Sequence, residues 1–133
     1  MGYLFDSDVL SAMVAVRPNL EVVKRLSAVP LEEQNTSAIN VGEMLFGAMR
    51  RKHVGLLQRI ESLIEILSVV PFDESAARIY AHLRVGLEVA GTPLAEADLR
   101  IAATALAHNL TLVTGNERHF RRIAGLTIEN WLR

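Results

Sequence analysis

Residues 94–117 read LAEADLRIAATALAHNLTLVTGNE, and the fold can be worked out from this segment outward. Its alanine-rich part, residues 94–108, predicts a helix, and the continuous apolar run at residues 110–113 predicts a buried strand. Polar residues follow that strand directly. Strands with such continuous apolar runs are typical of parallel sheets, because helices cover both faces of the sheet.

The rest of the chain alternates in the same way between short strands and longer helices. Further strands are expected at residues 3–5, 34–39, 68–72 and 126–131. Further helices are expected at residues 9–16, 19–28, 40–49, 54–67 and 73–90. This order predicts a single domain over residues 1–133, folded as a three-layer α/β/α sandwich around a central parallel sheet.

The composition excludes several classes of protein. Half of the residues are hydrophobic, and 14 basic and 15 acidic side chains give a formal net charge of −1, so we expect neither disorder nor a basic surface covering the whole molecule. The chain has no cysteine, which excludes a disulfide scaffold and any cysteine-ligated metal site. No apolar run is long enough to cross a membrane and no export signal is present, so we expect a cytoplasmic protein.

Four polar residues lie where the working site of a parallel α/β fold is expected, beyond the carboxyl ends of the strands. Asp6 ends the first strand, Glu43 lies in the first turn of the helix after the second strand, and Asp98 lies near the start of the alanine-rich helix. Asn116 follows the strand that ends at Val113. Carboxylates that share one crevice repel one another unless a cation joins them, and Mg²⁺ or Mn²⁺ prefers oxygen ligands. Such an ion also activates water for attack on a phosphodiester.

Each of these residues also has a purely structural interpretation. Asp6 and Asp8 could cap the helix that follows, and Asn116 could occupy a turn. The segment from Asn40 to Glu43 fits a capping box, in which the glutamate reaches back to the first residue of the helix. The joint placement of the four residues, rather than any one of them, therefore indicates a site.

Asp98 is the hardest of the four to explain by structure alone. It lies on the same helix face as Leu94, Ile101, Ala102 and Ala105. A carboxylate on an apolar stripe is costly unless it is paired or bound to a metal. The alternative is that Asp98 stabilises the helix dipole from the first turn.

Three segments resemble the PIN-domain ribonucleases, and more closely the VapC-type toxins of VapBC toxin–antitoxin systems. They are YLFDSDVLSAM at residues 3–13, TSAINVGEMLFGAMRR at residues 36–51, and GTPLAEADLRIAATALAHNLTLVTGNERHFRRIAGLTIENW at residues 91–131. The resemblance implies a PIN-like sandwich with a parallel sheet of about five strands. It also implies a Mg²⁺- or Mn²⁺-dependent endoribonuclease that a cognate VapB-type antitoxin neutralises, in a homodimer and a toxin–antitoxin hetero-oligomer.

The same resemblance assigns roles to the site residues. Asp6, Glu43 and Asp98 match the catalytic metal ligands of the family, and Asn116 matches a fourth polar position that would orient the attacking water. Thr114 matches a hydroxyl position that lines the pocket. Because the fourth position is Asn rather than Asp, three carboxylates remain, and we expect one tightly held ion. The participation of three further polar residues is left open: Asp8, Glu117 and His119.

Basic residues flank the expected crevice on two sides. We expect Arg50, in the run of residues 50–53, and Arg118 to contact RNA phosphates. The alternative is a solvated helix face, which we favour for Lys52, or pairing with an acidic antitoxin tail.

Two other functions fit a small acidic α/β domain. A signalling receiver domain with Asp73 as its phosphate acceptor is disfavoured, because it needs a lysine after its last strand and the chain has only Lys24 and Lys52. The second is a PIN-fold module that binds RNA or a partner without cleaving it.

Overall fold

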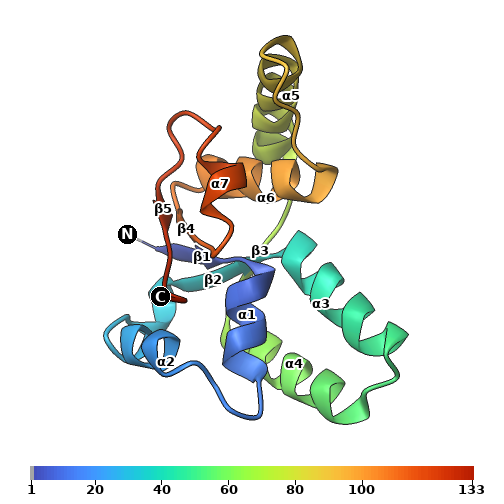
Figure 1. Cartoon of the computed structure of the whole chain (residues 1–133), viewed down its shortest axis with the longest axis vertical. Helices are drawn as coiled ribbons and strands as arrows, with labels where there is room; N and C mark the ends of the chain where they lie inside the picture. The colour runs from blue at the N-terminus through green and yellow to red at the C-terminus, as the bar shows by residue number, and fades with distance from the viewer. Residues whose placement is uncertain (1) are drawn as a thin grey trace.

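The computed structural model describes residues 2–133 and contains one five-stranded parallel sheet with the strand order β3-β2-β1-β4-β5 (Figure 1). The strands are β1 (Tyr3–Phe5), β2 (Gln34–Ser37), β3 (Ser68–Val70), β4 (Thr111–Val113) and β5 (Ile128–Glu129). The helices are α1 (Ser7–Val14), α2 (Leu20–Ser27), α3 (Ala38–Arg50), α4 (Val54–Ile66), α5 (Glu74–Val89), α6 (Glu96–Ala107) and α7 (Glu117–Phe120). The predicted α/β/α sandwich with a parallel sheet of five strands is confirmed.

Alternate residues of the central strands enter two separate cores, one on each face of the sheet. Leu4 of β1 and Leu112 of β4 pack against Ile101 of α6. The next residues, Phe5 and Val113, pack on the other face with α1, α2 and Trp131. This alternation follows from the two-residue period of a strand. Because both faces are buried, β1 lies at the centre of the molecule, and the residue that follows it is fixed from both sides.

Two helical hairpins extend from the sheet region, α3 with α4 and α5 with α6 (Figure 1). Helix α1 follows β1 directly and packs against both α3 and α4. A third small core, built from Val14, Ala48 and Ile60, joins these three helices. Among residues 2–133, no helix has the length and apolar character needed to span a bilayer.

The expected elements are all present, but several boundaries differ. The predicted strand at 34–39 ends at Ser37, because the Ser37 hydroxyl accepts a hydrogen bond from the Asn40 N–H and starts α3 at Ala38. The predicted capping box from Asn40 to Glu43 is therefore wrong. The short helix α7 and a 3₁₀ turn at Leu31–Glu33 were not expected, since three or four residues are too few for a periodic pattern.

Candidate functional site at the carboxyl edge of the sheet

Asp6 is the first residue after β1 and is buried, with 7% of its surface exposed. Its N–H donates to the Val113 carbonyl at 2.9 Å, which extends the pairing of β1 with β4 by one residue. Its Oδ1 accepts hydrogen bonds from the Ser7 N–H at 2.9 Å and from Asn40 Nδ2 at 3.0 Å, and its Oδ2 accepts from the Thr114 hydroxyl at 2.7 Å. Asp6 is thus the N-cap of α1 and also a carboxylate fixed by three elements.

Ser7 and Asn40 connect Asp6 to Glu43. The Ser7 hydroxyl donates to Glu43 Oε1 at 2.8 Å and accepts from Asn40 Nδ2 at 3.0 Å. Asn40 is fully buried, and its side-chain oxygen accepts a hydrogen bond from the Ser37 hydroxyl. The interpretation of Asn40 as a helix cap missed this bridging role. Its spacing of three from Glu43, which places both side chains on one helix face, is the signal that could have found it.

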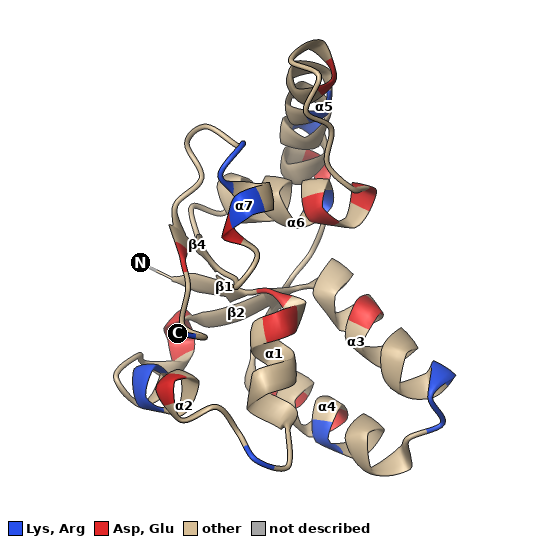
Figure 2. Ribbon diagram, viewed as in Figure 1, with Lys and Arg blue, Asp and Glu red and all other residues tan. Residues whose placement is uncertain are grey.

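Asp98 and Asn116 meet through His119. Asn116 Nδ2 and His119 Nδ1 lie 2.8 Å apart, and His119 Nδ1 lies 3.7 Å from Asp98 Oδ2. The Asn116 N–H donates to the Thr114 hydroxyl at 3.0 Å. These contacts join Asp98, His119, Asn116 and Thr114 to Asp6 in one network. Helices α1, α3 and α6, which carry the acidic residues of the network, all have acidic positions coloured red in Figure 2.

Thr114 is fully buried, and both hydrogen bonds of its hydroxyl are made to neighbours in the site. Its hydroxyl donates to Asp6 Oδ2 and accepts from the Asn116 N–H. A hydroxyl that is engaged and covered in this way holds Asp6 and Asn116 in place. Thr114, which was predicted to line the substrate pocket, is therefore buried behind Asp6 and Asn116 and does not reach the surface of the site.

Asp8 lies beside this network on the first turn of α1. Its Oδ2 accepts a hydrogen bond from the Gly115 N–H at 2.9 Å, whereas its Oδ1 is buried and has no hydrogen-bond partner. Glycine permits this approach: a Cβ at position 115 would lie 2.8 Å from Asp8 Oδ2 and 2.6 Å from Leu132 Cδ1, so one or both side chains would have to shift. An unpartnered carboxylate oxygen of this kind is costly in a protein interior.

Burial and the nearby charge of Asp6 raise the pKa of two carboxyl groups in the site, Asp98 and Asp8. Burial, followed by the negative charge of Asp6, raises the pKa of Asp98, while His119 partly offsets this. Burial and the same Asp6 charge raise the pKa of Asp8, against the hydrogen bond from Gly115. Both shifts have the cause expected of like charges in a partly dry crevice. A bound cation would remove the penalty.

The oxygen donors fit a hard divalent cation. The Asn40 amide contacts Asp6 directly, the Glu43 carboxylate connects to it through Ser7, and Asp8 has one carboxylate oxygen without a hydrogen-bond partner. Within residues 2–133, however, no three Asp, Glu or His side chains are grouped closely enough to hold an ion on their own. Mg²⁺ keeps several waters when it binds to proteins, so such an ion would be held by one or two carboxylates directly and by the others through water.

Of the residues left open by the sequence, His119 joins the network and Glu117 does not. The Glu117 carboxylate pairs with Arg133 and accepts from Asn130 Nδ2 at 3.0 Å. The Asn130 hydrogen bond is the main cause of the lowered pKa of Glu117. These contacts direct Glu117 toward the C-terminal residues rather than toward Asp98.

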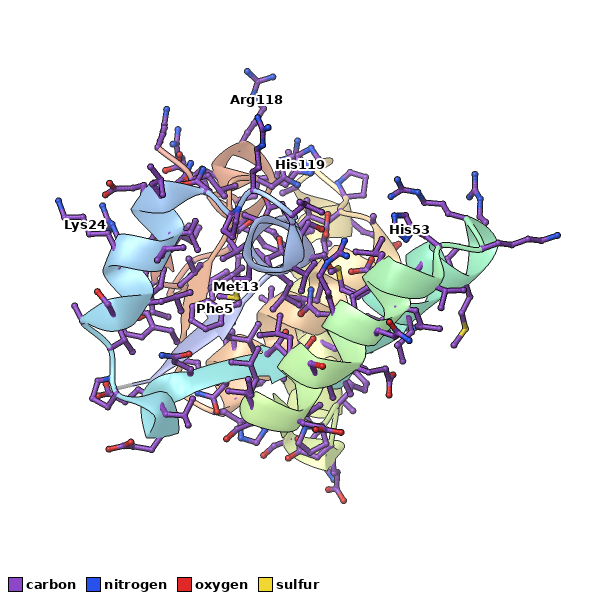
Figure 3. All side chains as sticks on the ribbon, turned by 90° about the horizontal axis from the view of Figure 1, so that it is seen from below. Phe5, Met13, Lys24, His53, Arg118 and His119 are labelled. Carbon is purple, nitrogen blue, oxygen red and sulfur yellow. The ribbon has the colours of Figure 1, made fainter. Side chains whose placement is uncertain are left out.

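The two arginines expected to contact substrate are exposed. Arg118 projects outward from α7 (Figure 3), and Arg50 lies in the last turn of α3. Neither guanidinium forms an ion pair within residues 2–133. Both are therefore available to a polyanion.

The contacts of Asp73 do not favour a phosphate acceptor. Its Oδ1 accepts from the Ala76 N–H as the N-cap of α5, and its Oδ2 lies 3.3 Å from His108 Nε2. Oδ1 is therefore engaged in the helix cap, whereas Oδ2 lies near His108 without a hydrogen bond, since His108 Nε2 has no hydrogen-bond partner among the described residues.

Comparison with known proteins gives consistent matches. The PIN domain family model matches residues 3–126. The chain is 37% identical over 125 residues to the toxin FitB of Neisseria gonorrhoeae, covering 88% of this chain and 89% of that protein. It is 29% identical over 137 residues to the ribonuclease VapC2 of Rickettsia felis, covering 98% of each. A solved structure of VapBC2 from Rickettsia felis, bound to a DNA fragment from its promoter, superposes with a TM-score of 0.90 at 27% identity, covering 98% of this chain and 99% of that one.

Proposed function

The chain belongs to the PIN domain family, and we propose that it is a metal-dependent endoribonuclease toxin that a cognate VapB-type antitoxin neutralises. The observation that carries this proposal is the network that links Asp6, Glu43 and Asp98 at one end of the sheet. The similarity to a ribonuclease and to a toxin over nearly the whole chain supports it. The antitoxin complex of the similar VapC2 supports a protein partner for this chain as well.

We assign metal binding to Asp6, Asp98 and Glu43, with Mg²⁺ or Mn²⁺ as the ion. When bound, the ion activates water and neutralises charge on the phosphodiester. Asp6 would be the central ligand, because three hydrogen bonds fix its orientation before any ion arrives. Glu43 would act through the Ser7 hydroxyl or a water, since Ser7 separates it from Asp6. We therefore propose one tightly held ion rather than two.

The remaining residues would position the reactants. Asn116 would orient the attacking water: its side-chain amide contacts His119, and its backbone N–H donates to the Thr114 hydroxyl. Thr114 would keep Asp6 in place without contacting RNA. Arg50 and Arg118, both exposed and unpaired within the described chain, would contact substrate phosphates on either side of the site.

We further propose that the protein acts in the cytoplasm as a homodimer and in a toxin–antitoxin hetero-oligomer. Large apolar side chains are exposed on several helices, including Leu20 of α2, Phe46 of α3, and Val85 and Val89 of α5. Such side chains are candidates for burial in a protein interface. The antitoxin and the second copy of the chain would cover some of them.

Cleavage of a structured RNA by the purified protein tests the proposal. The wild-type protein is expected to cleave with added Mn²⁺ or Mg²⁺ and to stop when a chelator is added, whereas Asp6→Asn and Asp98→Asn are expected to be inactive. Glu65→Gln, which removes one exposed carboxylate from α4, is the matched control and should cleave like the wild type. Equal cleavage by all four proteins would show that the network is not catalytic.

A non-cleaving module is distinguished in the same experiment. Its signature would be a shifted RNA band in a gel, at equal strength with and without the ion, and no product from any of the proteins.

A further inference from the structure

A cavity of about 510 Å³ lies between α1, α3 and α4, next to the proposed hydrolytic site. Ser7 and Glu43 line its inner end, and these are the two side chains that connect to Asp6. Its other end is lined by Arg51, His53 and Arg59. The cavity therefore adjoins the site through these two side chains, and a chain bound at the site can extend into it.

The outer end of the cavity carries positive charge that no carboxylate balances. Glu43 is the only acidic residue among those that line the cavity, and its Oε1 is bound to the Ser7 hydroxyl. No ion pair within residues 2–133 involves Arg51 or Arg59. Guanidinium groups are suited to phosphate, because their planar fork of donors matches its oxygens.

The donors are also held in position. Arg59 Nε donates to the Val14 carbonyl at 2.7 Å, which fixes its guanidinium and leaves its other N–H groups free. His53 Nδ1 accepts a hydrogen bond from the Leu56 N–H at 3.0 Å, so the neutral ring carries its proton on Nε2. A Cβ built on Gly55 would lie 3.5 Å from both the His53 ring and Arg59 Nη1, so these two groups flank one point. His53 lies at the junction of α3 and α4 (Figure 3).

The floor of the cavity is apolar. It is formed by Val14, Met44, Leu56 and Ile60. An apolar floor beneath a cationic rim can take the sugar and base of a nucleotide while the rim holds its phosphate. From Glu43 to Arg51, α3 rises about 12 Å at 1.5 Å per residue, so this phosphate would be a different one from the phosphate that is cut.

We propose that this cavity is an RNA subsite, in which Arg51, His53 and Arg59 bind a phosphate of the substrate strand away from the cleaved bond. The choice of RNA as the ligand rests on the proposed function. Because Ser7 and Glu43 line both the cavity and the proposed site, the substrate strand is favoured over a protein carboxylate as the occupant of the cavity. Arg51 is the residue that specifies the subsite, since Arg59 also has a structural bond to Val14. The sequence pointed to Arg50 in this run, but its neighbour lines the cavity.

The test measures RNA binding in a chelator, so that it does not depend on cleavage. The probe is a fluorescent single-stranded oligouridylate, and its dissociation constant is measured at several salt concentrations. Arg51→Gln is expected to weaken binding about tenfold, as for one lost charge-assisted hydrogen bond, and to reduce the slope of log K against log salt by about 0.7. Arg51→Lys should restore the slope but only part of the affinity.

Lys52→Gln is the matched control. It removes the same charge from the same turn, and both residues are exposed, but Lys52 does not line the cavity. Its affinity and salt slope should equal those of the wild type, and thermal unfolding should show that both variants are folded. Equal slopes for Arg51→Gln and Lys52→Gln would overturn the proposal.

A second probe, a polyglutamate peptide, separates the two kinds of polyanion. If Arg51→Gln weakens peptide binding and leaves RNA binding unchanged, the cavity belongs to a protein partner and the proposal is overturned. If RNA binding depends on Arg51 but no RNA is cleaved with metal, the subsite stands and the endoribonuclease assignment fails.

Discussion

Replacing Thr114 with valine tests how Asp6 is held. Valine has nearly the same shape as threonine, so the substitution removes the hydroxyl with little change in packing. The hydroxyl donates to Asp6 Oδ2 at 2.7 Å and accepts from the Asn116 N–H at 3.0 Å, at a position that is fully buried. Both contacts are lost together.

The size of the effect follows from these two contacts. A hydrogen bond to a charged group contributes about 1.5–3 kcal/mol, and an N–H left without a partner costs about 1–3 kcal/mol. Since Asp6 keeps its bonds from Ser7 and Asn40, and the Asn116 N–H lies in a half-buried residue, we take the lower end of each range. Thr114→Val should then lower the free energy of unfolding by about 2–4 kcal/mol. For a chain of this length that lowers the Tm by roughly 8–15 °C.

Urea unfolding and thermal unfolding measure this loss, and RNA cleavage measures its consequence for the site. Thr104→Val is the matched control, because Thr104 is also fully buried but its hydroxyl donates to the Arg100 carbonyl within α6. That carbonyl also has its helical partner, so the control should lose less than about 1 kcal/mol. If the two variants are equally stable and equally active, the account of Thr114 as the support of Asp6 is incorrect.

Three further outcomes follow from the same contacts. Gly115→Ala should destabilise the protein by about 1–3 kcal/mol in urea unfolding, because the new methyl group displaces the Asp8 carboxylate from the Gly115 N–H; unchanged stability would mean that this contact is loose. Asn40→Ala should lower RNA cleavage even at temperatures where the variant is fully folded, because it removes the hydrogen bonds from Asn40 Nδ2 to the Asp6 carboxylate and to the Ser7 hydroxyl; full activity would contradict the bridging role. Asp98→Asn should make the metal-free protein more stable at neutral pH. The pKa of Asp98 is raised in the folded state, so folding favours the protonated carboxyl group. The wild type therefore loses stability as the pH rises above the ordinary aspartate pKa of about 4. The difference in Tm between Asp98→Asn and the wild type, measured in a chelator, should vanish below that pH. A difference that grows toward acid pH would mean that the pKa of Asp98 is lowered in the folded state and would contradict the prediction.

The positions of Asp6 and Asp98 could be predicted from the sequence because each has a local signal. Asp6 ends a continuous apolar run, and the carboxyl ends of parallel strands meet at one edge of the sheet. Asp98 interrupts an apolar stripe, where a carboxylate is costly unless it is paired or bound to a cation. The sheet itself was predictable in the same way, since its central strands are buried on both faces.

The contacts between segments could not be predicted, because they depend on strand register and on helix packing. The bond from Thr114 to Asp6 exists because β1 and β4 pair with Phe5 opposite Val113. The role of Asn40 depends on α3 starting two residues earlier than its sequence suggested, and Ser37 and Asn40 are equally good capping residues. A one-residue shift in helix phase likewise decides whether Arg50 or Arg51 faces the cavity.

The central claim is that Asp6, Asp98 and Glu43 share one divalent cation. The most direct measurement is the binding of Mn²⁺ to the metal-free protein by titration calorimetry, with no RNA present. The wild type and Glu65→Gln should each bind one ion with the same affinity, whereas Asp6→Asn and Asp98→Asn should each bind it at least tenfold more weakly, as expected when a carboxylate ligand is lost. Equal Mn²⁺ binding by all four proteins would contradict the claim.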